Sequence, residues 1–382
     1  MHLVDTTLFF SPTSGGVKRY LTAKQSWLAA NTSWRHSLVV PGPERALVPG
    51  GISTLSGLKV PGTFNYRLPL SMPAWTAMLD ALEPDLIEAG DAFHPAWCAL
   101  KVADRRRIPA VAFFHSNLPR LIGRRLGSVS ERVVGRYLRL AYERMNLVQA
   151  PSRLMCDYLR SLGIERVSHQ PLGVDSETFA PHRRREDLRQ RLGLAPGVRL
   201  LAYAGRFAGE KNLPVLHDAF ARLGDGYHLL LLGGGRSYRA ASNVTVMPYR
   251  RNPVELAEAL ASVDALVHAG TAETFGLVIL EAMACGRPVV GIDSGAVPEL
   301  VDDEVGTLAS RADGELFARA VRDLYDRDVE QLGRAARTRV LTRFTWQQAM
   351  QVQMAAYAGL AGTEPAVVAR PANAGIVATA ID

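Results

Sequence analysis

The sequence of 382 residues has few cysteines and no long apolar run. Its three cysteines, Cys98, Cys156 and Cys285, lie far apart and in no C-x-x-C spacing. Neither a zinc site nor a disulfide is indicated, and we expect buried free thiols in a reducing cytoplasm. No run approaches the roughly eighteen apolar residues that span a bilayer. Residues 1–7 lack a basic leader region, so they are interpreted as a first strand and the protein as cytoplasmic or peripheral.

Signatures of several cofactors and partners are also missing. Neither the Gly15-Gly16 turn nor Gly233-Gly234-Gly235 matches G-x-G-x-x-G, which disfavours a nicotinamide dehydrogenase. Asp326-Arg327-Asp328 has D-x-D spacing but lies in a polar stretch, 324–331, that we interpret as a solvated helical surface. No other cluster has metal-ligand spacing, so we expect no metal and no cofactor. The net charge of +7 comes without interleaved aromatic residues, so no nucleic-acid partner is expected.

What the sequence does contain is a regular alternation of short apolar runs and longer amphipathic stretches. This alternation predicts an α/β protein with two doubly wound parallel sheets, and hence two Rossmann-like domains facing across a cleft. The periodicity stops near residues 171–175, which suggests domains over 1–172 and 173–345, and residues 363–382 are interpreted as a loose tail. The predicted strands are 2–6, 36–40, 85–89, 110–114, 147–150, 199–204, 228–232, 244–247, 264–268 and 288–292, with helices at 18–30, 212–223, 254–262 and 277–285.

Two carboxylates, Glu273 and Glu281, flank the start of a predicted helix. Gly276 opens this helix, and the distance between the two carboxylates is a little over two helical turns, so both can face one cleft. The free N–H groups at the helix start suit a phosphate between them. Apolar neighbours leave little solvated face, so buried carboxylates here need partners. A ligand with hydroxyl groups at both ends and phosphate in the middle fits this arrangement, and a sugar nucleotide has that shape.

Further candidate residues follow other predicted strands. Arg206 and Lys211 come after strand 199–204 and would place two cations at its carboxyl end, where anionic ligands bind. Gly16 lies in a turn before the first helix, where adjacent glycines let the backbone approach a pyrophosphate. His115 ends strand 110–114 and faces the expected cleft, although a histidine at a strand end is more often structural than catalytic.

Basic residues gather between residues 101 and 144, which hold eleven lysine or arginine residues and three acidic ones, a local net charge of +8. Leu118, Leu121, Ile122 and Leu126 are interleaved with Arg120, Arg124 and Arg125 in a basic amphipathic pattern. Docking on an anionic membrane explains this pattern. A solvated basic helix or a groove for an acidic glycan explains the same charge.

From about Thr6 to Tyr357 the chain resembles the retaining GT-B glycosyltransferases of family GT4. The resemblance rests on the Gly15-Gly16 turn, Ala150-Pro-Ser152, Gly173-Val-Asp175, the stretch from Gly205 to Lys211, and the block from Glu273 to Val290. It implies a last helix over 346–362 that crosses back to the first domain. It also implies an enzyme that moves a hexose, with mannose the first choice, from a nucleoside-diphosphate sugar to a glycan or lipid-linked acceptor.

The resemblance assigns roles to the candidate residues. Arg206 and Lys211 would bind the donor diphosphate, which Gly16 approaches from the other domain. The backbone of Phe275, Gly276 and Leu277 would donate to phosphate, and Glu281 would bind the ribose. Glu273 and His115 would lie at the transferred sugar as the catalytic pair, and residues 249–251 would pack the nucleobase.

Two other functions remain open on the same residues. A GT-B epimerase would share the fold, whereas a phosphorylase would need a cofactor lysine in an apolar pocket that the sequence does not show. A non-catalytic subunit that binds sugar nucleotides is the alternative from a different class. The retention of Arg206, Lys211, Glu273 and Glu281 together argues against that alternative, because a decayed site should have lost some of them.

Overall fold

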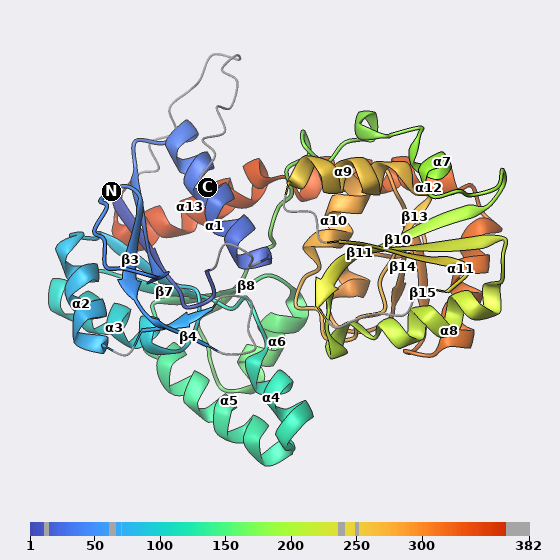
Figure 1. Ribbon diagram of the computed structural model, residues 1–382. Coiled ribbons are helices and arrows are strands. Elements are labelled where there is room, and N and C mark those ends of the chain that lie inside the picture. The colour runs from blue at the N-terminus through green and yellow to red at the C-terminus, as the bar shows by residue number, and fades with distance from the viewer. Residues whose placement is uncertain (11–14, 61–65, 70, 236–240, 249–251, 364–382) are drawn as a thin grey trace.

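The computed structural model of the chain describes residues 1–10, 15–60, 66–69, 71–235, 241–248 and 252–363. These residues fold into two α/β units, each built on its own parallel sheet (Figure 1). We call the unit around the seven-stranded sheet the N-terminal domain and the unit around the six-stranded sheet the C-terminal domain.

The N-terminal domain is a parallel sheet in the order β3-β2-β1-β6-β7-β8-β9. Its central strands are buried along their whole length because helices cover both faces, which explains why they are continuous apolar runs. A short antiparallel pair, β4 (Leu58–Lys59) and β5 (Arg67–Leu68), lies outside this sheet. The strands are β1 (His2–Thr6), β2 (Arg35–Gly42), β3 (Ile52–Ser56), β6 (Leu86–Ala89), β7 (Ala110–Phe113), β8 (Leu147–Ala150) and β9 (Val167–His169), and the helices are α1 (Gly16–Asn31), α2 (Met72–Ala81), α3 (His94–Arg106), α4 (Leu118–Leu126), α5 (Ser128–Tyr142) and α6 (Arg153–Ser161).

The C-terminal domain repeats this plan with the strand order β12-β11-β10-β13-β14-β15. The chain order reverses between β10 and β13, and in the other sheet between β1 and β6, which makes both positions topological switch points. Its strands are β10 (Arg199–Phe207), β11 (Tyr227–Gly235), β12 (Val244–Pro248), β13 (Ala265–Val267), β14 (Val289–Ile292) and β15 (Gly306–Ala309), and its helices are η1 (Pro181–Arg183), α7 (Leu188–Arg191), η2 (Gly209–Lys211), α8 (Leu213–Leu223), α9 (Pro253–Ser262), α10 (Leu277–Ala284), η3 (Val297–Glu299), α11 (Gly314–Tyr325) and α12 (Val329–Arg343).

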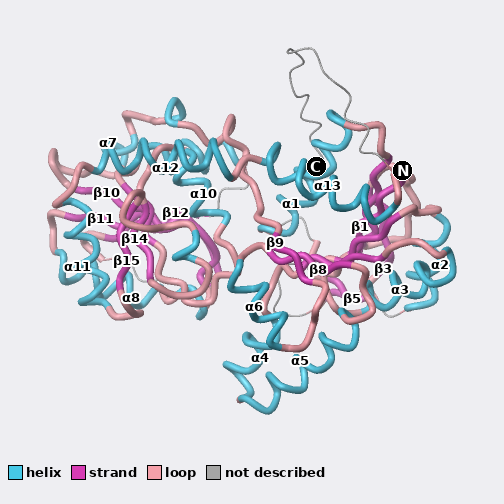
Figure 2. Tube along the Cα trace, turned by 180° about the vertical axis from the view of Figure 1, so that it is seen from behind, coloured by secondary structure: helices cyan, strands magenta, loops and turns pink. Residues whose placement is uncertain are grey.

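The last described helix, α13 (Trp346–Ala361), returns to the N-terminal domain and packs beside α1, as seen from both sides in Figures 1 and 2. The predicted crossover helix is therefore confirmed. Where the chain leaves the C-terminal domain, it runs beside the earlier connection, and Val174 N donates to Phe344 O at 2.8 Å. The two connections between the domains thus lie side by side.

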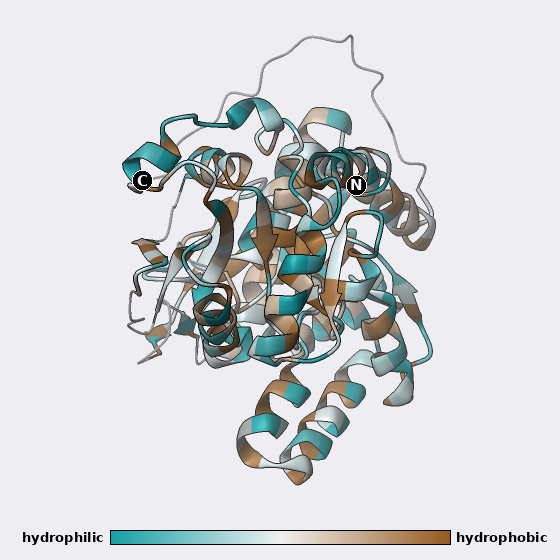
Figure 3. Ribbon diagram, turned by 90° about the vertical axis from the view of Figure 1, so that its right-hand side faces the viewer, coloured by the Kyte–Doolittle hydropathy of each residue, from teal (hydrophilic) through white to brown (hydrophobic). Residues whose placement is uncertain are grey.

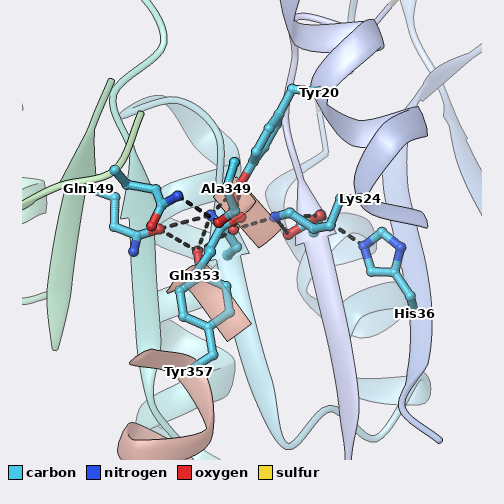
Figure 4. Close-up of polar contacts among 10 residues, drawn as sticks. Tyr20, Lys24, His36, Gln149, Ala349, Gln353 and Tyr357 are labelled. Atoms are coloured by element: carbon cyan, nitrogen blue, oxygen red, sulfur yellow. Dashed lines mark hydrogen bonds and ion pairs between the residues drawn. The ribbon is translucent and has the colours of Figure 1, made fainter. Parts of the chain in front are cut away.

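A buried polar cluster fixes α13 to the N-terminal sheet (Figure 4). Gln353 Nε2 on α13 donates to Tyr20 Oη at 2.6 Å and to Gln149 Oε1 at 2.8 Å. Tyr357 donates to Glu88, which also accepts from the fully buried Lys24. Because these groups are hydrogen-bonded to one another, their burial is tolerated and the position of α13 is specified.

All ten predicted strands and four predicted helices are present in the structure, with ends that shift by a few residues. The prediction missed β3, β9 and β15 of the two parallel sheets, and also the short antiparallel pair β4 and β5. The three cysteines are free and buried, as predicted. Within the described residues, no helix combines the length and apolarity needed to cross a bilayer.

Candidate active site

Two helix N-termini from different domains meet beside the switch points of the sheets. A Cβ atom on Gly16, which begins α1, would lie 3.3 Å from Leu277 Cδ1 at the start of α10. Among the described residues, no side chain caps either helix, and Gly276 before α10 has φ of 103°, a conformation that favours glycine. The N–H groups and dipoles of two helices therefore point toward one place, which is suited to a diphosphate.

Glu281 lies one turn into α10 and is 2% exposed. Its Oε1 forms an ion pair with Arg19, which lies one turn into α1 in the other domain. Its Oε2 is buried and has no hydrogen-bond partner in the described part of the chain. Burial raises the pKa of the Glu281 carboxyl, and the charge of Arg19 opposes this rise. One oxygen is thus left to accept from a ligand.

Glu273 lies in the loop between β13 and α10, with two nitrogen atoms directed at one of its oxygens. Lys211 Nζ forms an ion pair with Oε1, and His268 Nε2 lies 3.0 Å from the same atom. Burial alone would raise the pKa of this carboxyl, but Lys211 and His268 outweigh that effect and hold the pKa well below its usual range. Glu273 is therefore a carboxylate at any pH near neutrality.

Arg206 and Lys211 reach the cleft from the end of β10 and from η2. Arg206 is the more accessible of the two cations, with its side chain 55% exposed and Nη2 3.5 Å from Glu210 Oε1. Both cations line a pocket between the domains, together with Glu273 and Thr274. On the opposite wall, the N-terminal domain contributes Ser116, Asn117, Arg120, Leu121, Leu154 and Met155.

His115 follows β7 at the edge of this region. Its ring stacks on Phe113 with centroids 4.4 Å apart, and its Nε2 is enclosed without a partner among the described residues, although the residue as a whole is only partly buried. Burial, helped by the charge of Lys24, lowers the pKa of His115 to about 3. The imidazole is therefore neutral near pH 7. Thr274 Oγ1 donates to the His115 carbonyl at 3.0 Å and joins the two domains at this point.

The structure brings most of the candidate residues together. Phe275 is an exception, because its side chain is 4% exposed and packs edge-on against Phe344, so it can contribute only through its backbone. The candidate nucleobase residues, 249–251, lie outside the described residues. The roles of Gly16, Arg206, Lys211, Glu273 and Glu281 stay predictions.

The interpretation of Asp326 and Asp328 as exposed surface is confirmed, but the expected continuous helix is wrong. Asp326 ends α11, and Asp328 caps α12 by accepting from Gln331 N at 2.9 Å. Two further residues of the site, Arg19 and His268, were not predicted from the sequence. His268 is the last residue of the predicted strand 264–268, a position at the carboxyl end that could have marked it, whereas the long-range pairing of Arg19 with α10 had no local signal.

Two doubly wound domains with a polar pocket between them, joined by a returning C-terminal helix, define the GT-B class of transferases. The glycosyltransferase family 4 model matches residues 14–178, and the model of glycosyl transferases group 1 matches residues 198–327. The chain therefore belongs to the group 1 glycosyltransferases of family 4, and the protein is a glycosyltransferase.

Similar proteins agree with this assignment. The chain is 30% identical to a GDP-mannose-dependent alpha-(1-6)-phosphatidylinositol dimannoside mannosyltransferase of Mycobacterium tuberculosis, over 94% of this chain and 97% of the relative. A sucrose-phosphate synthase from Thermosynechococcus elongatus has a similar structure, with a TM-score of 0.79 and 21% identity over 94% of this chain and 98% of that one. HepE of Anabaena, solved with UDP-glucose, gives a TM-score of 0.74 and 19% identity over 94% of this chain and 100% of that one. The two structures support the fold.

Proposed function

We propose that this enzyme transfers a hexose, mannose, from GDP-mannose to a lipid-linked or polysaccharide acceptor with retention of configuration. The observation that carries the proposal is the meeting of two uncapped helix N-termini beside Arg206, Lys211, Glu273 and Glu281. Arg206 and Lys211 would bind the phosphates of the donor. Glu281 would bind its ribose, and Glu273 its sugar. The GDP-mannose-dependent relative of M. tuberculosis supports the choice of donor.

The proposed chemistry uses groups of the chain together with the phosphate of the donor. Negative charge develops on the diphosphate as the glycosidic bond breaks, and Arg206, Lys211 and the two helix N-termini would stabilise that charge. Glu273 would bind hydroxyl groups of the transferred sugar. The leaving phosphate oxygen would accept the proton of the acceptor, which attacks from the same face, and domain contact would keep out water that otherwise hydrolyses the donor.

His115 fits a role as a neutral hydrogen-bonding group beside the sugar. Because its pKa is about 3, it carries no charge that would compete with Arg206 and Lys211 for the diphosphate. An enclosed ring nitrogen can donate to or accept from a sugar hydroxyl, depending on the tautomer.

The acceptor and its location are inferred from the helical hairpin of α4 and α5, which projects from the body of the N-terminal domain (Figures 1 and 3). Four apolar side chains on it are exposed by 59% or more: Leu126, Val129, Val133 and Leu140. The last three share one face of α5 with Arg132 and Arg136, which are also exposed. A basic and apolar surface of this kind suits the interface of an anionic membrane, where a lipid-linked acceptor would be found.

The exposed apolar residues of the hairpin are not the ones that the sequence pattern of α4 predicted. Leu118, Leu121 and Ile122 are partly buried, and Leu121 lines the pocket, so the apolar face expected on α4 points inward. Arg105 and Arg106 form ion pairs with Asp80, which removes part of the local charge from any docking surface. The proposed membrane surface therefore consists of Leu126 and the face of α5.

Thermal denaturation with a panel of nucleotide sugars tests the proposed donor. A ligand that binds only the folded state raises the melting temperature in proportion to its affinity, so GDP-mannose should give a larger rise than UDP-glucose or ADP-glucose at equal concentration. Incubation of the preferred donor with extracted lipids should then yield a glycosylated lipid. A larger rise with a UDP-sugar would contradict the choice of GDP-mannose, and no rise with any nucleotide sugar would contradict the proposed function.

A further inference from the structure

Arg19 and Glu281 face each other across the two domains in the same way as Gly16 and Leu277. Gly16 meets Leu277 at the starts of α1 and α10, and Arg19 meets Glu281 one turn further along each helix. The ion pair is therefore part of the contact between the two helix N-termini, at the place where the proposed donor diphosphate would lie.

Only one oxygen of Glu281 takes part in this ion pair. Arg19 Nη1 contacts Oε1, whereas Oε2 is buried and has no partner in the part of the chain that the structure describes. Buried carboxylate oxygens in proteins nearly always accept hydrogen bonds, so the lone Oε2 points to a ligand that donates. The two hydroxyl groups of a ribose are such donors.

We propose that Arg19 is a positioning residue of the donor site, which holds Glu281 by Oε1 so that Oε2 accepts from the donor ribose. This inference rests on the proposed function. Glu281 is 2% exposed, and Arg19 of the opposite domain is the cation that pairs with its carboxylate. The carboxylate is therefore correctly placed only while the two domains are in contact, which couples ribose binding to domain closure.

The charge of Glu281 depends on Arg19 more than on its other neighbours. Cys285 lies one turn further along α10, and Arg337 reaches the end of that helix by donating to the Ala284 carbonyl. Arg19 is the cation that opposes the effect of burial on the Glu281 carboxyl. Without Arg19, Glu281 would take up a proton at a higher pH and lose an acceptor for the ribose hydroxyls.

Titration calorimetry with GDP and UDP, together with donor kinetics, tests this role in the full chain. Arg19→Met should weaken nucleotide binding and raise the donor KM by about tenfold to a hundredfold, with a smaller change in kcat. The rise in KM should become larger as the pH is lowered from 8.5 to 6, and Arg19→Lys should restore most of the binding. Arg45→Met, which removes an exposed arginine of the same domain, is the matched control and should bind as the wild type does.

The double variant separates positioning from a purely structural contact. In a Glu281→Gln background, Arg19→Met should change nucleotide affinity less than threefold, because the oxygen that it orients is no longer a carboxylate. Equal losses in both backgrounds, or a lower melting temperature with unchanged nucleotide affinity, would overturn the proposal while leaving the proposed function intact. If the wild type binds neither GDP nor UDP, the proposed function fails and this inference fails with it.

Discussion

At the scale of single residues, the site keeps two carboxylates, the partly buried Glu273 and the buried Glu281, in different electrical environments. Glu273 faces Lys211 and His268 and has a lowered pKa, whereas Glu281 has a raised pKa because burial outweighs Arg19. Lys211, which would bind the diphosphate, therefore already balances Glu273, whereas Glu281 is balanced by Arg19. Removing Lys211 or Arg19 would leave the charge of its carboxylate partner uncompensated, so single substitutions of these two residues are informative.

The diphosphate contacts can be tested directly. Arg206→Ala and Lys211→Ala should each lower kcat/KM by about a hundredfold or more, because each removes a cation that we propose stabilises charge developing in the transition state. Steady-state kinetics with the preferred nucleotide sugar measures this change. Arg222→Ala, which removes an exposed arginine paired with Asp218 on α8, is the control and should leave kcat/KM within twofold. Near-normal turnover in both active-site variants would remove the assignment.

The lowered pKa of His115 predicts a pH dependence of stability. The neutral ring is favoured in the folded state, so its contribution is fully present above the unfolded pKa of 6.5 and is lost as the pH falls toward about 3. Between those values, the unfolding free energy of the wild type should fall more steeply with decreasing pH than that of His115→Asn, by at most about 1.4 kcal/mol per pH unit. Urea denaturation at several pH values measures both slopes, and parallel slopes would contradict the neutral state of the ring.

The site residues that could be predicted from the sequence are those marked by a pattern in the neighbouring sequence. Glu273, Glu281, Arg206 and Lys211 stand next to predicted strand ends and a helix start, so their clustering followed from the alternation of strands and helices. Arg19 could not be found in this way. Its partner is 262 positions away on another domain, and the pairing depends on how the two sheets face each other.

At the scale of elements, the hairpin of α4 and α5 carries two different surfaces. Its inner side lines the pocket through Arg120 and Leu121, and Arg124 Nη2 lies 3.3 Å from Thr271 Oγ1 of the other domain. Substitutions of α4 arginines would therefore disturb the site as well as a membrane contact. The outer face of α5 separates the two effects, because its residues do not line the pocket.

A test of membrane docking should accordingly use α5. Val129→Ser with Val133→Ser should reduce sedimentation with anionic vesicles, and Arg132→Ser with Arg136→Ser should reduce it most at low salt, since each basic residue near the surface contributes about 1 kcal/mol. Binding of the wild type should fall steeply as salt rises. Val352→Ser, which changes an exposed valine on α13, is the control. Equal recovery with neutral and anionic vesicles, or no loss in either double variant, would refute docking through α5.

The polar cluster beneath α13 contains an ion pair that can be tested separately from the site. Burial alone would raise the pKa of Asp5, but Lys24 and His36 hold it below its usual range, while burial and the charge of Asp5 raise the pKa of Glu88. Lys24→Met removes the cation that pairs with the buried carboxyls of Asp5 and Glu88. Urea denaturation should show a loss of about 3 to 5 kcal/mol of unfolding free energy.

A compensating change distinguishes loss of charge from loss of packing in this cluster. Adding Glu88→Gln to Lys24→Met should recover part of the lost stability, because one unpaired buried carboxylate is then removed. A loss below about 1 kcal/mol in the single variant, or further destabilisation in the double variant, would contradict the proposed balance of charges.

Fold prediction succeeded for the buried central strands and for the edge strand β12, but it missed the edge strands β3, β9 and β15. The central strands are apolar on both faces and bounded by turn residues, so their pattern is strong. β3 alternates between buried and partly exposed positions, β9 has only three residues, and β15 reads Gly-Thr-Leu-Ala. Such short or mixed segments gain their strand conformation from pairing with a neighbouring strand, which a local pattern does not reveal.

At the scale of the whole molecule, the two domains touch through a small set of contacts on the side of the site. Arg19 pairs with Glu281, and Thr274 bonds to the His115 carbonyl. Glu299 of the C-terminal domain accepts from Arg153 N at 2.8 Å and Leu154 N at 2.9 Å, which are the first N–H groups of α6. A carboxylate at a helix N-terminus is stabilised by the helix dipole, so Glu299 favours domain contact.

Weakening this contact should shift the domains apart without changing any group that touches the donor. We expect Glu299→Ala to lower kcat/KM about tenfold and to increase the radius of gyration measured by solution X-ray scattering, because two charge-assisted hydrogen bonds favour the closed arrangement. GDP at saturating concentration should reverse the expansion, since the proposed donor site uses groups from both domains. Glu304→Ala is the control, because Glu304 pairs with Arg339 at 2.7 Å within one domain. If Glu299→Ala has the dimensions and the kcat/KM of the wild type, closure does not depend on this contact and must rest on the other contacts between the domains, such as those of Arg19 and Thr274.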